Sequence, residues 1–316
     1  MAASYQTGTA TSPVDLQNKL VAWLALQGWT TNMDAVDGSG RRAHLSKGST
    51  YVNFRALMNE TVYLGLGSQY GLSMYLSTAF NSGSQWYAQT GGPIRTSDSN
   101  TAAAWMQLPS GSINAYHFFD DGNDNIVVVV ERATGIFTNM CFGPTITKAG
   151  TITGGAYFSA TFSNSNTSLT GAGSTTLSAL CPFAANGDAG TFPNSYIRAD
   201  VDTYINKWLN FSTGTTGNTG RTGKSQQGSN SLPDEIPHYA NFVNRQTSAL
   251  TSQANLLPLR VFAPRDATPG GYSLLGEIPN IFVCNGVANG YSPASIISLG
   301  PDNYMLFPNF AVKKFA

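Results

Sequence analysis

The sequence predicts an α+β protein that is mainly β, with antiparallel sheets in a sandwich or barrel-like arrangement. Three observations predict this class. The stretch Asn114–Pro144 has the pattern of three short strands joined by turns. The composition is rich in glycine, with 33 residues, and only 11% of the residues are charged, which favours turns over long solvated helices. Apolar residues with helical spacing occur at Ser12–Gln27 and Ser195–Phe211, so we expect one N-terminal and one mid-chain helix packed on the sheets.

The N-terminal helix is predicted over Ser12–Gln27. Ser12 is a candidate N-cap, Pro13 suits the first helical position and Asp15 completes a capping box. Gly28 is placed to end the helix. The stripe with helical spacing consists of Leu16, Leu20, Trp23, Leu24 and Gln27. Such a helix either forms an internal lid on a sheet or lines a contact between subunits.

A β-hairpin is predicted next, with strands Arg42–Ser46 and Thr50–Ala56 joined at Lys47-Gly48. It carries a basic cluster, formed by Arg41, Arg42, His44, Lys47 and Arg55. This cluster is either a solvated face with salt-bridge partners or a patch that contacts DNA passing through a ring. The candidate patch residues are Arg41, Arg42, Lys47 and Arg55.

Further strands are expected before and within the central stretch. Tyr70–Ser77 alternates aromatic, apolar and small residues, Gln85–Ala88 follows it, and Ala102–Leu108 precedes the central stretch. The three central strands are predicted at Tyr116–Asp120, Ile126–Arg132 and Ile136–Phe142. Glycine and asparagine in the connections tolerate the positive φ that tight hairpins need. The four consecutive valines, Val127–Val130, suit a strand covered on both faces.

The second half of the chain has long uncharged segments. Ala149–Gly187 contains no charged residue, so we expect either an arm covered by a neighbouring copy or a flexible exposed loop. The mid-chain helix is expected over Ser195–Phe211, and Thr213–Ser231 is a linker candidate. Pro237–Ala249 is expected to hold short helical or extended pieces. C-terminal strands are predicted at Leu256–Pro264, Gly271–Leu275, Ile278–Asn285, Ile296–Leu299 and Tyr304–Phe310.

These elements suggest a division into three parts. Residues 1–148 form the N-terminal helix and an antiparallel β body. Residues 149–232 form a low-charge loop or arm region with one helix, and residues 233–316 form a C-terminal β region that packs back on the body. The alternative is that all three form one continuous domain.

Cysteine usage fits a reducing compartment, and the hydropathy pattern predicts neither a signal peptide nor a membrane span. Cys141, Cys181 and Cys284 are far apart and no CxxC or Cys/His spacing occurs, so no zinc site is predicted. Cys141 and Cys284 lie in apolar runs and are expected to be buried thiols. The N-terminus has no basic and apolar regions of a signal peptide. No uncharged apolar run approaches the roughly 18 residues needed to span a bilayer, so no membrane contact is expected.

Candidate catalytic residues are few. Asp120, Asp121, Asp124 and Glu131 fall near one turn. We expect these carboxylates to satisfy backbone groups of the turn; a cation site or a glycosidase-like carboxylate pair is the alternative. The three histidines, His44, His117 and His238, lie in unrelated contexts, and no nucleophile elbow, P-loop or dinucleotide-binding motif occurs. The sequence therefore predicts no catalytic, cofactor-binding or metal-binding residue and no enzyme activity.

The charge balance argues against a dedicated nucleic-acid binder. Seventeen basic residues balance 17 acidic residues, whereas nucleic-acid-binding proteins usually have a basic excess. A net charge near zero also weakens repulsion between copies, which suits a protein that assembles.

Several long segments resemble a family of structural proteins from the virions of tailed bacteriophages. The segments are YQTGTATSPVDLQNKLVAWLALQGWT (Tyr5–Thr30), RAHLSKGSTYVNFRALMNE (Arg42–Glu60), AYHFFDDGNDNIVVVVERATGIFTNMCFG (Ala115–Gly143), RADVDTYINKWL (Arg198–Leu209), RQTSALTSQANLLPLRVFAPRD (Arg245–Asp266) and DNYMLFPNFAVKK (Asp302–Lys314). The resemblance spans nearly the whole chain. It implies a virion protein of the tail or neck module, assembled in the host cytoplasm, with copies in a ring, typically of six, on the tail axis. It supplies no catalytic residues.

The resemblance also implies a set of partners and functions. The partners are other copies of the chain, tail proteins and head–tail connector proteins, with non-specific contact to DNA in the tail channel. The first functional hypothesis is a neck, gateway or tail-completion (terminator) ring that joins the tail tube or sheath to the head connector. The alternatives are a baseplate or receptor-binding tail protein and a polysaccharide hydrolase of the tail.

Overall fold

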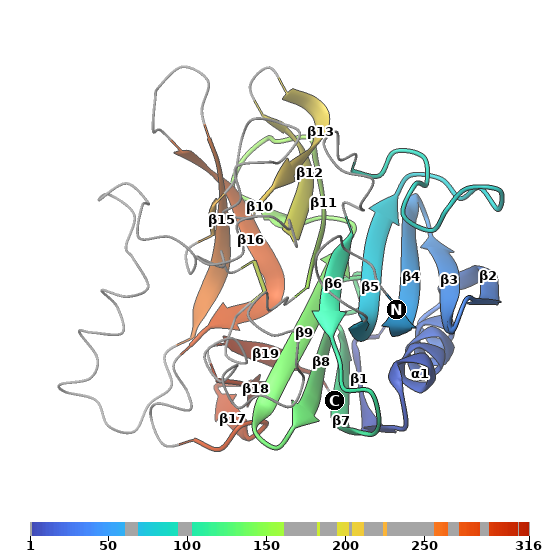
Figure 1. The fold of residues 1–316 in the computed structure, drawn as a ribbon. Helices are drawn as coiled ribbons and strands as arrows, with labels where there is room; N and C mark the ends of the chain where they lie inside the picture. Colours follow the sequence, from blue (N-terminus) through green and yellow to red (C-terminus); the bar gives the residue numbers. More distant parts are fainter. Residues whose placement is uncertain are drawn as a thin grey trace.

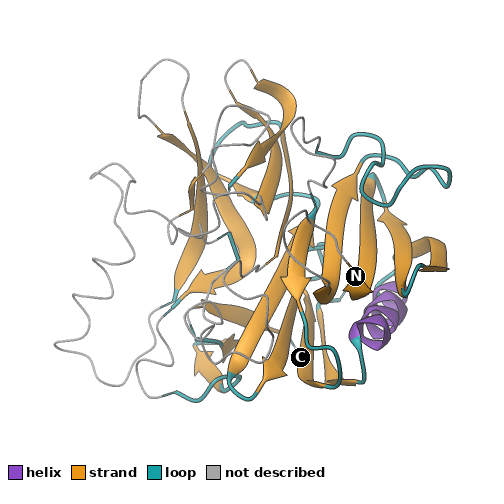
Figure 2. Cartoon of the chain, in the orientation of Figure 1, coloured by secondary structure: helices purple, strands orange, loops and turns teal. Residues whose placement is uncertain are grey.

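The described part of the chain is a stack of three antiparallel β-sheets with one helix (Figures 1 and 2). This computed structural model describes residues 2–60, 69–93, 103–160, 182–183, 195–201, 204–211, 224–225, 256–264, 272–284, 291–308 and 310–315. The mainly β, antiparallel class predicted from the sequence is confirmed. We name the layers the helix-side sheet, the central sheet and the C-terminal sheet.

The central sheet has seven strands in the order β1-β7-β8-β9-β11-β12-β13. Their bounds are β1 Ser4–Ala10, β7 Ile113–Asp120, β8 Ile126–Ala133, β9 Ile136–Gly143, β11 Gly154–Ala160, β12 Ser195–Val201 and β13 Tyr204–Asn210. The three predicted central strands are β7, β8 and β9, and adjacent strands pair in antiparallel register. The N-terminal strand β1, which the sequence analysis missed, pairs with β7.

The valine run of β8 is buried on both faces of the central sheet, as predicted. Val128 and Val130 belong to the core shared with the helix-side sheet, whereas Val127 and Val129 belong to the core shared with the C-terminal sheet. All four are fully buried. Because successive side chains of a strand point to opposite faces, only a sheet sandwiched between two layers can bury such a run.

The helix-side sheet has the order β2-β3-β4-β5-β6. The bounds are β2 Thr30–Asp37, β3 Gly40–Lys47, β4 Thr50–Glu60, β5 Gln69–Ser77 and β6 Ala104–Gln107. The predicted hairpin is β3–β4, and the predicted strands around residues 70–77 and 102–108 are β5 and β6. The strand predicted at Gln85–Ala88 is wrong, because this segment forms a turn in which the Ala88 amide donates to the Gln85 carbonyl oxygen at 3.0 Å.

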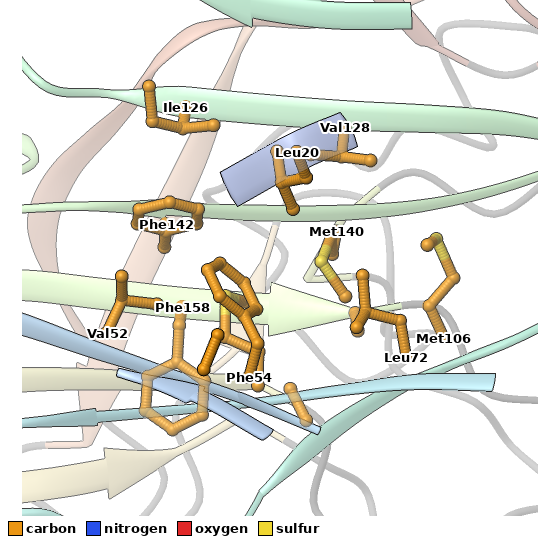
Figure 3. Close-up of a cluster of buried hydrophobic side chains, with 14 of the residues drawn as sticks. Leu20, Val52, Phe54, Leu72, Met106, Ile126, Val128, Met140, Phe142 and Phe158 are labelled. Atoms are coloured by element: carbon orange, nitrogen blue, oxygen red, sulfur yellow. The ribbon is translucent and has the colours of Figure 1, made fainter. Parts of the chain in front are cut away.

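Helix α1, Pro13–Leu26, closes the core between the central and helix-side sheets. The Ser12 hydroxyl caps it by accepting from the Asp15 amide at 3.1 Å. The Asp15 carboxylate accepts from the Thr11 amide at 2.8 Å, one residue before the position that a capping box uses. Figure 3 shows Leu20 directed into the same cluster as Val128 and Phe142. The helix is therefore an internal lid, the first of the two roles predicted for it.

The C-terminal sheet has the order β14-β15-β16-β19-β18-β17, and β10 also pairs with β16. The bounds are β10 Thr147–Lys148, β14 Lys224–Ser225, β15 Leu257–Pro264, β16 Tyr272–Val283, β17 Ile296–Leu299, β18 Asp302–Leu306 and β19 Phe310–Lys314. Two predicted strands, Gly271–Leu275 and Ile278–Asn285, merge into the single strand β16. The predicted strand Tyr304–Phe310 is wrong in extent, because it runs across the turn between β18 and β19.

The predicted mid-chain helix over Ser195–Phe211 is wrong, because this segment is the hairpin β12–β13. Ile197 and Leu209 face each other across the hairpin and enter the core with the C-terminal sheet. Tyr196 and Trp208 enter the core on the opposite face. The dense apolar residues fit a helical stripe and a two-sided strand equally well. Pairing of β12 with β11 favours the strand over the helix, because packing overrides a weak local preference for either secondary structure.

The predicted uncharged arm, Ala149–Gly187, is corrected in its first part. Gly154–Ala160 is strand β11, an interior strand of the central sheet, and Tyr157 and Phe158 are fully buried. Absence of charge here reflects burial within the chain. Residues 161–181 and 184–187 lie outside the described residues. So do Pro237–Ala249 and the linker Thr213–Ser231, except Lys224–Ser225. Strands from the predicted parts 1–148 and 149–232 share the central sheet.

Candidate functional site

The predicted basic patch lies on β3 and β4 of the helix-side sheet, where Arg42 is directly opposite Arg55. Arg41 forms an ion pair with Asp34 of the neighbouring strand β2, with 2.6 Å between Nε and Oδ1. The hydrogen bond to Asp34 raises the pKa of the Arg41 guanidinium above its ordinary value. This basic side chain is therefore neutralised within the sheet.

Arg55 is buried, with 5% of its surface exposed. Its Nε lies 3.0 Å from Asp37 Oδ2, and its NH2 donates to Glu60 Oε2 at 2.5 Å. The other terminal nitrogen donates to the Ala56 carbonyl oxygen. A buried charge is costly unless it is paired and hydrogen-bonded. Arg55 meets this requirement and ties the end of β2 to the end of β4.

Lys47 connects three elements at the tip of the β3–β4 hairpin. Its Nζ forms an ion pair with Asp124, in the turn between β7 and β8 of the central sheet. The same Nζ donates to the carbonyl oxygen of Gln27, the C-cap residue of α1, at 2.7 Å. The structure thus brings one member of the basic patch together with one member of the acidic turn, which were separate in the sequence analysis.

Arg42 differs from the other patch residues. It takes part in no ion pair within the described ranges, and its buried Nε lacks a hydrogen-bond partner. The other three basic side chains of the patch form ion pairs with four acidic residues: Asp34, Asp37, Glu60 and Asp124. The patch therefore carries no local excess of positive charge.

The acidic turn is held by its own hydrogen bonds. Asp120 Oδ1 accepts from the Gly122 amide at 2.8 Å, and Asp121 Oδ1 accepts from the Asn123 amide at 2.8 Å. Gly122 and Asp124 have positive φ values of 80° and 68°, which a tight turn requires. The predicted role of these carboxylates in the turn is confirmed for Asp120 and Asp121.

Glu131 is not part of this turn. Its carboxylate accepts from the Gly135 amide at 2.8 Å, in the following β8–β9 connection. Over the residues that the structure describes, no group of three or more His, Cys, Asp or Glu residues is arranged to hold a metal ion. The predicted carboxylate cluster therefore divides between two hairpin turns.

Asp120 has one carboxylate oxygen without a partner. The side chain is fully buried, and Oδ2 makes no hydrogen bond in the described part of the chain. Burial raises the pKa of this carboxyl group above its ordinary value. Ser4 lies opposite in the register with β1, and its hydroxyl also lacks a partner.

The two described histidines lie on different sheets. His44 Nδ1 contacts Asn53 Oδ1 at 2.6 Å, on β3 and β4. His117 Nδ1 contacts the Tyr5 hydroxyl at 2.9 Å, on the face of the central sheet toward the C-terminal sheet. Burial lowers the pKa of His117 to about 4, so the ring is neutral near pH 7. His238 lies outside the described residues.

The described cysteines, Cys141 and Cys284, are buried, as predicted. Burial raises the pKa of the Cys141 thiol well above its ordinary value. A thiol in this state is a poor nucleophile, because the thiolate is the reactive form. Cys181 lies outside the described residues.

Three acidic partners were not anticipated from the sequence, two of them because strand β2 was missed. Asp34 and Asp37 lie on β2, and Glu60 lies at the end of β4. Met33, Ala35 and Asp37 alternate with more exposed positions, and Gly38 has a positive φ of 59°. An alternating run followed by Asp-Gly is a hairpin pattern that could have identified this strand.

No protein-family model matches the chain, and no curated protein is significantly similar to it. None of the described segments forms a helix with the length and apolar character needed to cross a membrane.

Proposed function

We propose that this chain is a non-enzymatic structural protein of a tailed-phage virion. It forms a ring in the neck, as a gateway or tail-completion protein, and joins the tail tube or sheath to the head connector. The resemblance of its long segments to virion proteins of the tail or neck module supports this proposal. Its partners are further copies of the chain, tail proteins and connector proteins.

The observation that carries the proposal is the central sheet covered on both faces. Its strands are buried between two further sheets, with separate apolar cores on each side. Such a body resists deformation, because close-packed interiors have low compressibility. Most charged side chains of the basic patch and of the acidic turn form ion pairs or hydrogen bonds within the turn. Such internally engaged charges suit a scaffold.

Contact with DNA in the tail channel is a narrower part of the proposal. Of the four patch residues, Arg42 alone has no ion pair among the described residues. A non-specific backbone contact needs only such a positive side chain. Arg42→Gln should then leave ring formation unchanged and weaken DNA retention in assembled particles, and unchanged retention would remove DNA contact from the proposal.

The location is tested by labelling the protein in assembled particles. We expect a label fused to the chain to appear as a ring at the junction of head and tail in electron micrographs. A label at the distal end of the tail would support the baseplate or receptor-binding alternative. Protein that stays monomeric and never enters particles would contradict the proposal.

The hydrolase alternative has a separate test. Asp120→Asn and Asp124→Asn each remove a carboxylate that such an enzyme would need. We expect particles carrying either substitution to keep their infectivity and any activity on host polysaccharide. Loss of polysaccharide cleavage with normal particle assembly would favour an enzyme instead.

A further inference from the structure

The loop Thr78–Pro93, which follows β5, is a compact surface element at the upper right of Figure 1. Its ends are close together, since the Thr78 amide donates to the Thr90 carbonyl oxygen at 2.9 Å. The buried side chain of Gln89 fills its centre. It accepts from the Asn81 amide at 2.6 Å and donates to the Asn81 carbonyl oxygen at 3.1 Å. A loop of this kind is an Ω-loop, which is packed by its own side chains.

The first residues of this loop rest on a polar relay across the helix-side sheet. The side-chain nitrogen of Asn53 on β4 donates to the Ser77 hydroxyl oxygen at 3.0 Å, and the Ser77 hydroxyl donates to the Ala79 carbonyl oxygen at 3.1 Å. His44 of β3 lies opposite Asn53 in the register. The Phe80 ring packs against the His44 ring, with 4.8 Å between the ring centroids. The start of the loop is therefore joined to His44 both through Asn53 and directly through Phe80.

The hydrogen bonds of Asn53 show which nitrogen of the neutral His44 ring carries the hydrogen. The Asn53 nitrogen also donates to the Tyr75 carbonyl oxygen at 2.9 Å, and a carbonyl oxygen can only accept. The Asn53 atom that lies 2.6 Å from His44 Nδ1 is therefore the acceptor Oδ1, so Nδ1 carries the hydrogen. Nε2 is then a bare acceptor. It is buried and makes no hydrogen bond within the described ranges.

Protonation of His44 would add a hydrogen and a charge at Nε2, where no acceptor is present. The residue is only 1% exposed, and a buried charge with an unsatisfied donor is costly. Burial has the largest effect on the ring and holds its pKa below the ordinary value; Arg42 also lowers this pKa, whereas Asp37 raises it. The ionisable side chains on this face of the sheet are Asp37 of β2, Arg42 of β3, Tyr51 and Arg55 of β4, and Tyr75 of β5. Asp37 is already paired with Arg55, and the loop itself contains no charged residue.

The end of the loop is held independently of His44. The Tyr75 hydroxyl donates to the Pro93 carbonyl oxygen at 2.8 Å, and Nε1 of Trp208 on β13 donates to the Gly91 carbonyl oxygen at 2.9 Å. Neither donor changes its charge near neutral pH. Loss of the contact with His44 should therefore free the first half of the loop and leave Gly91–Pro93 in place.

We propose that His44 is a proton-sensitive latch, whose neutral ring holds the first half of the loop closed and whose protonation releases it. The bond from Nδ1 to Asn53 survives protonation, so the ring stays in place and Phe80 moves away to admit water to Nε2. The contribution of the latch is complete above the ordinary histidine pKa of 6.5 and is lost as the pH falls below it. The latch is independent of the proposed function, because it lies within a single copy of the chain.

Hydrogen exchange of the intact protein tests the latch. The exchange is measured at about pH 7.5 and about pH 5 and corrected for the intrinsic rates, so that it reports local opening. We expect the amides of Ala79–Ser84 to exchange about threefold faster or more at the lower pH, and those of Gly91 and Gly92 to stay unchanged. Exchange in Ala79–Ser84 that does not depend on pH would overturn the proposal.

Two histidine variants identify the group that takes up the proton. His44→Gln keeps a side-chain donor for Asn53 and does not titrate, so the loop should be equally protected at both pH values. His117→Gln is the matched control, because His117 lies on the central sheet, and this variant should keep the response of the loop. A response that persists in His44→Gln, or that disappears in His117→Gln, would assign the proton to another group and overturn the latch.

Phe80→Ala tests the other side of the contact and does not require His44 to be changed. Phe80 is only partly buried, so its truncation should leave the fold intact. We expect Ala79–Ser84 to exchange at about pH 7.5 as fast as the wild type does at about pH 5. The pKa of His44, followed by NMR of its imidazole, should rise toward 6.5. A pKa that Phe80→Ala leaves unchanged would show that the loop does not cover the ring, and this result would also overturn the latch.

Discussion

The two faces of the central sheet are built from the same strands but differ in chemistry. The face toward the helix-side sheet buries aromatic and aliphatic side chains, including Phe118, Val128 and Phe142, with α1 across one end (Figure 3). The face toward the C-terminal sheet buries Val127 and Val129, and it also buries the imidazole of His117.

Because of this difference, protonation changes the stability of the folded state in opposite directions at the two faces. Protonation of His117 places a charge inside a poorly solvated layer, where Phe119 and Phe307 flank the ring. Asp120, at the end of β7 on the helix side, has a pKa raised by burial, so its protonation favours the folded state. The pKa shifts of His117 and Asp120, on opposite faces of β7, thus make protonation destabilising at one face and stabilising at the other.

The largest expected effect comes from two adjacent phenylalanines that face opposite ways. Phe118 contacts Trp23 of α1, with 5.4 Å between ring centroids, and Phe119 contacts Tyr5 of β1 at 5.1 Å. Phe118→Ala and Phe119→Ala should each lower the free energy of unfolding by about 3–5 kcal/mol, because each leaves a cavity in a packed core. Denaturant titration measures this loss.

Hydrogen exchange then shows whether the layers are separable. Phe118→Ala should accelerate exchange mainly in α1 and the helix-side sheet, and Phe119→Ala mainly in the C-terminal sheet. Equal acceleration in all three sheets for both variants would show a single cooperative unit and remove the contrast between the faces.

The next effect is the pH dependence that His117 confers. Its pKa is about 4 in the folded protein, below the ordinary value of 6.5, so the unfolded chain binds the extra proton between these pH values. Its contribution is therefore complete above pH 6.5 and is lost as the pH falls toward 4. The loss should approach about 3 kcal/mol, since one pKa unit corresponds to about 1.4 kcal/mol.

His117→Gln is the control for this prediction. Glutamine keeps an acceptor for the Tyr5 hydroxyl but does not titrate in this range. We expect unfolding measured from pH 7 to pH 4 to show a flatter profile than the wild type. Some acid sensitivity should persist, because burial also lowers the pKa of His44. A profile identical to that of the wild type would assign the acid sensitivity elsewhere.

The features that could be predicted from the sequence were those whose local pattern is compatible with only one local structure. Val127–Val130 is such a case, because four branched apolar residues in a row require cover on both faces of a strand. Helix α1 is another, since its cap residues and apolar stripe agree. The hairpin β12–β13 was not predictable in this way. Its partner β11 lies in a separate segment whose lack of charge suggested an arm.

The candidate sites were predictable as residues but not as contacts. The basic side chains of β3 and β4 were identified, whereas their partners depend on strand β2 and on how sheets stack. Lys47 and Asp124 belong to different sheets, so no spacing rule connects them. Long-range register and layer order decide such pairs, and neither is encoded in a short pattern.

The smallest expected effect concerns this ion pair, which adds a polar link on the helix side of the central sheet. Lys47 and Asp124 are only partly exposed, with 18% and 29% of their side chains accessible. A double-mutant cycle with Lys47→Met and Asp124→Asn should give a coupling energy of about 0.5–1 kcal/mol, which falls in high salt. Asparagine tolerates the positive φ at position 124, so this substitution isolates the charge.

The Lys19–Asp15 pair on α1 is more exposed and serves as the matched control, with a coupling of about 0.3–0.5 kcal/mol expected. If the Lys47–Asp124 coupling is no larger than that of the control pair, the two sheets are joined on this side by apolar packing alone.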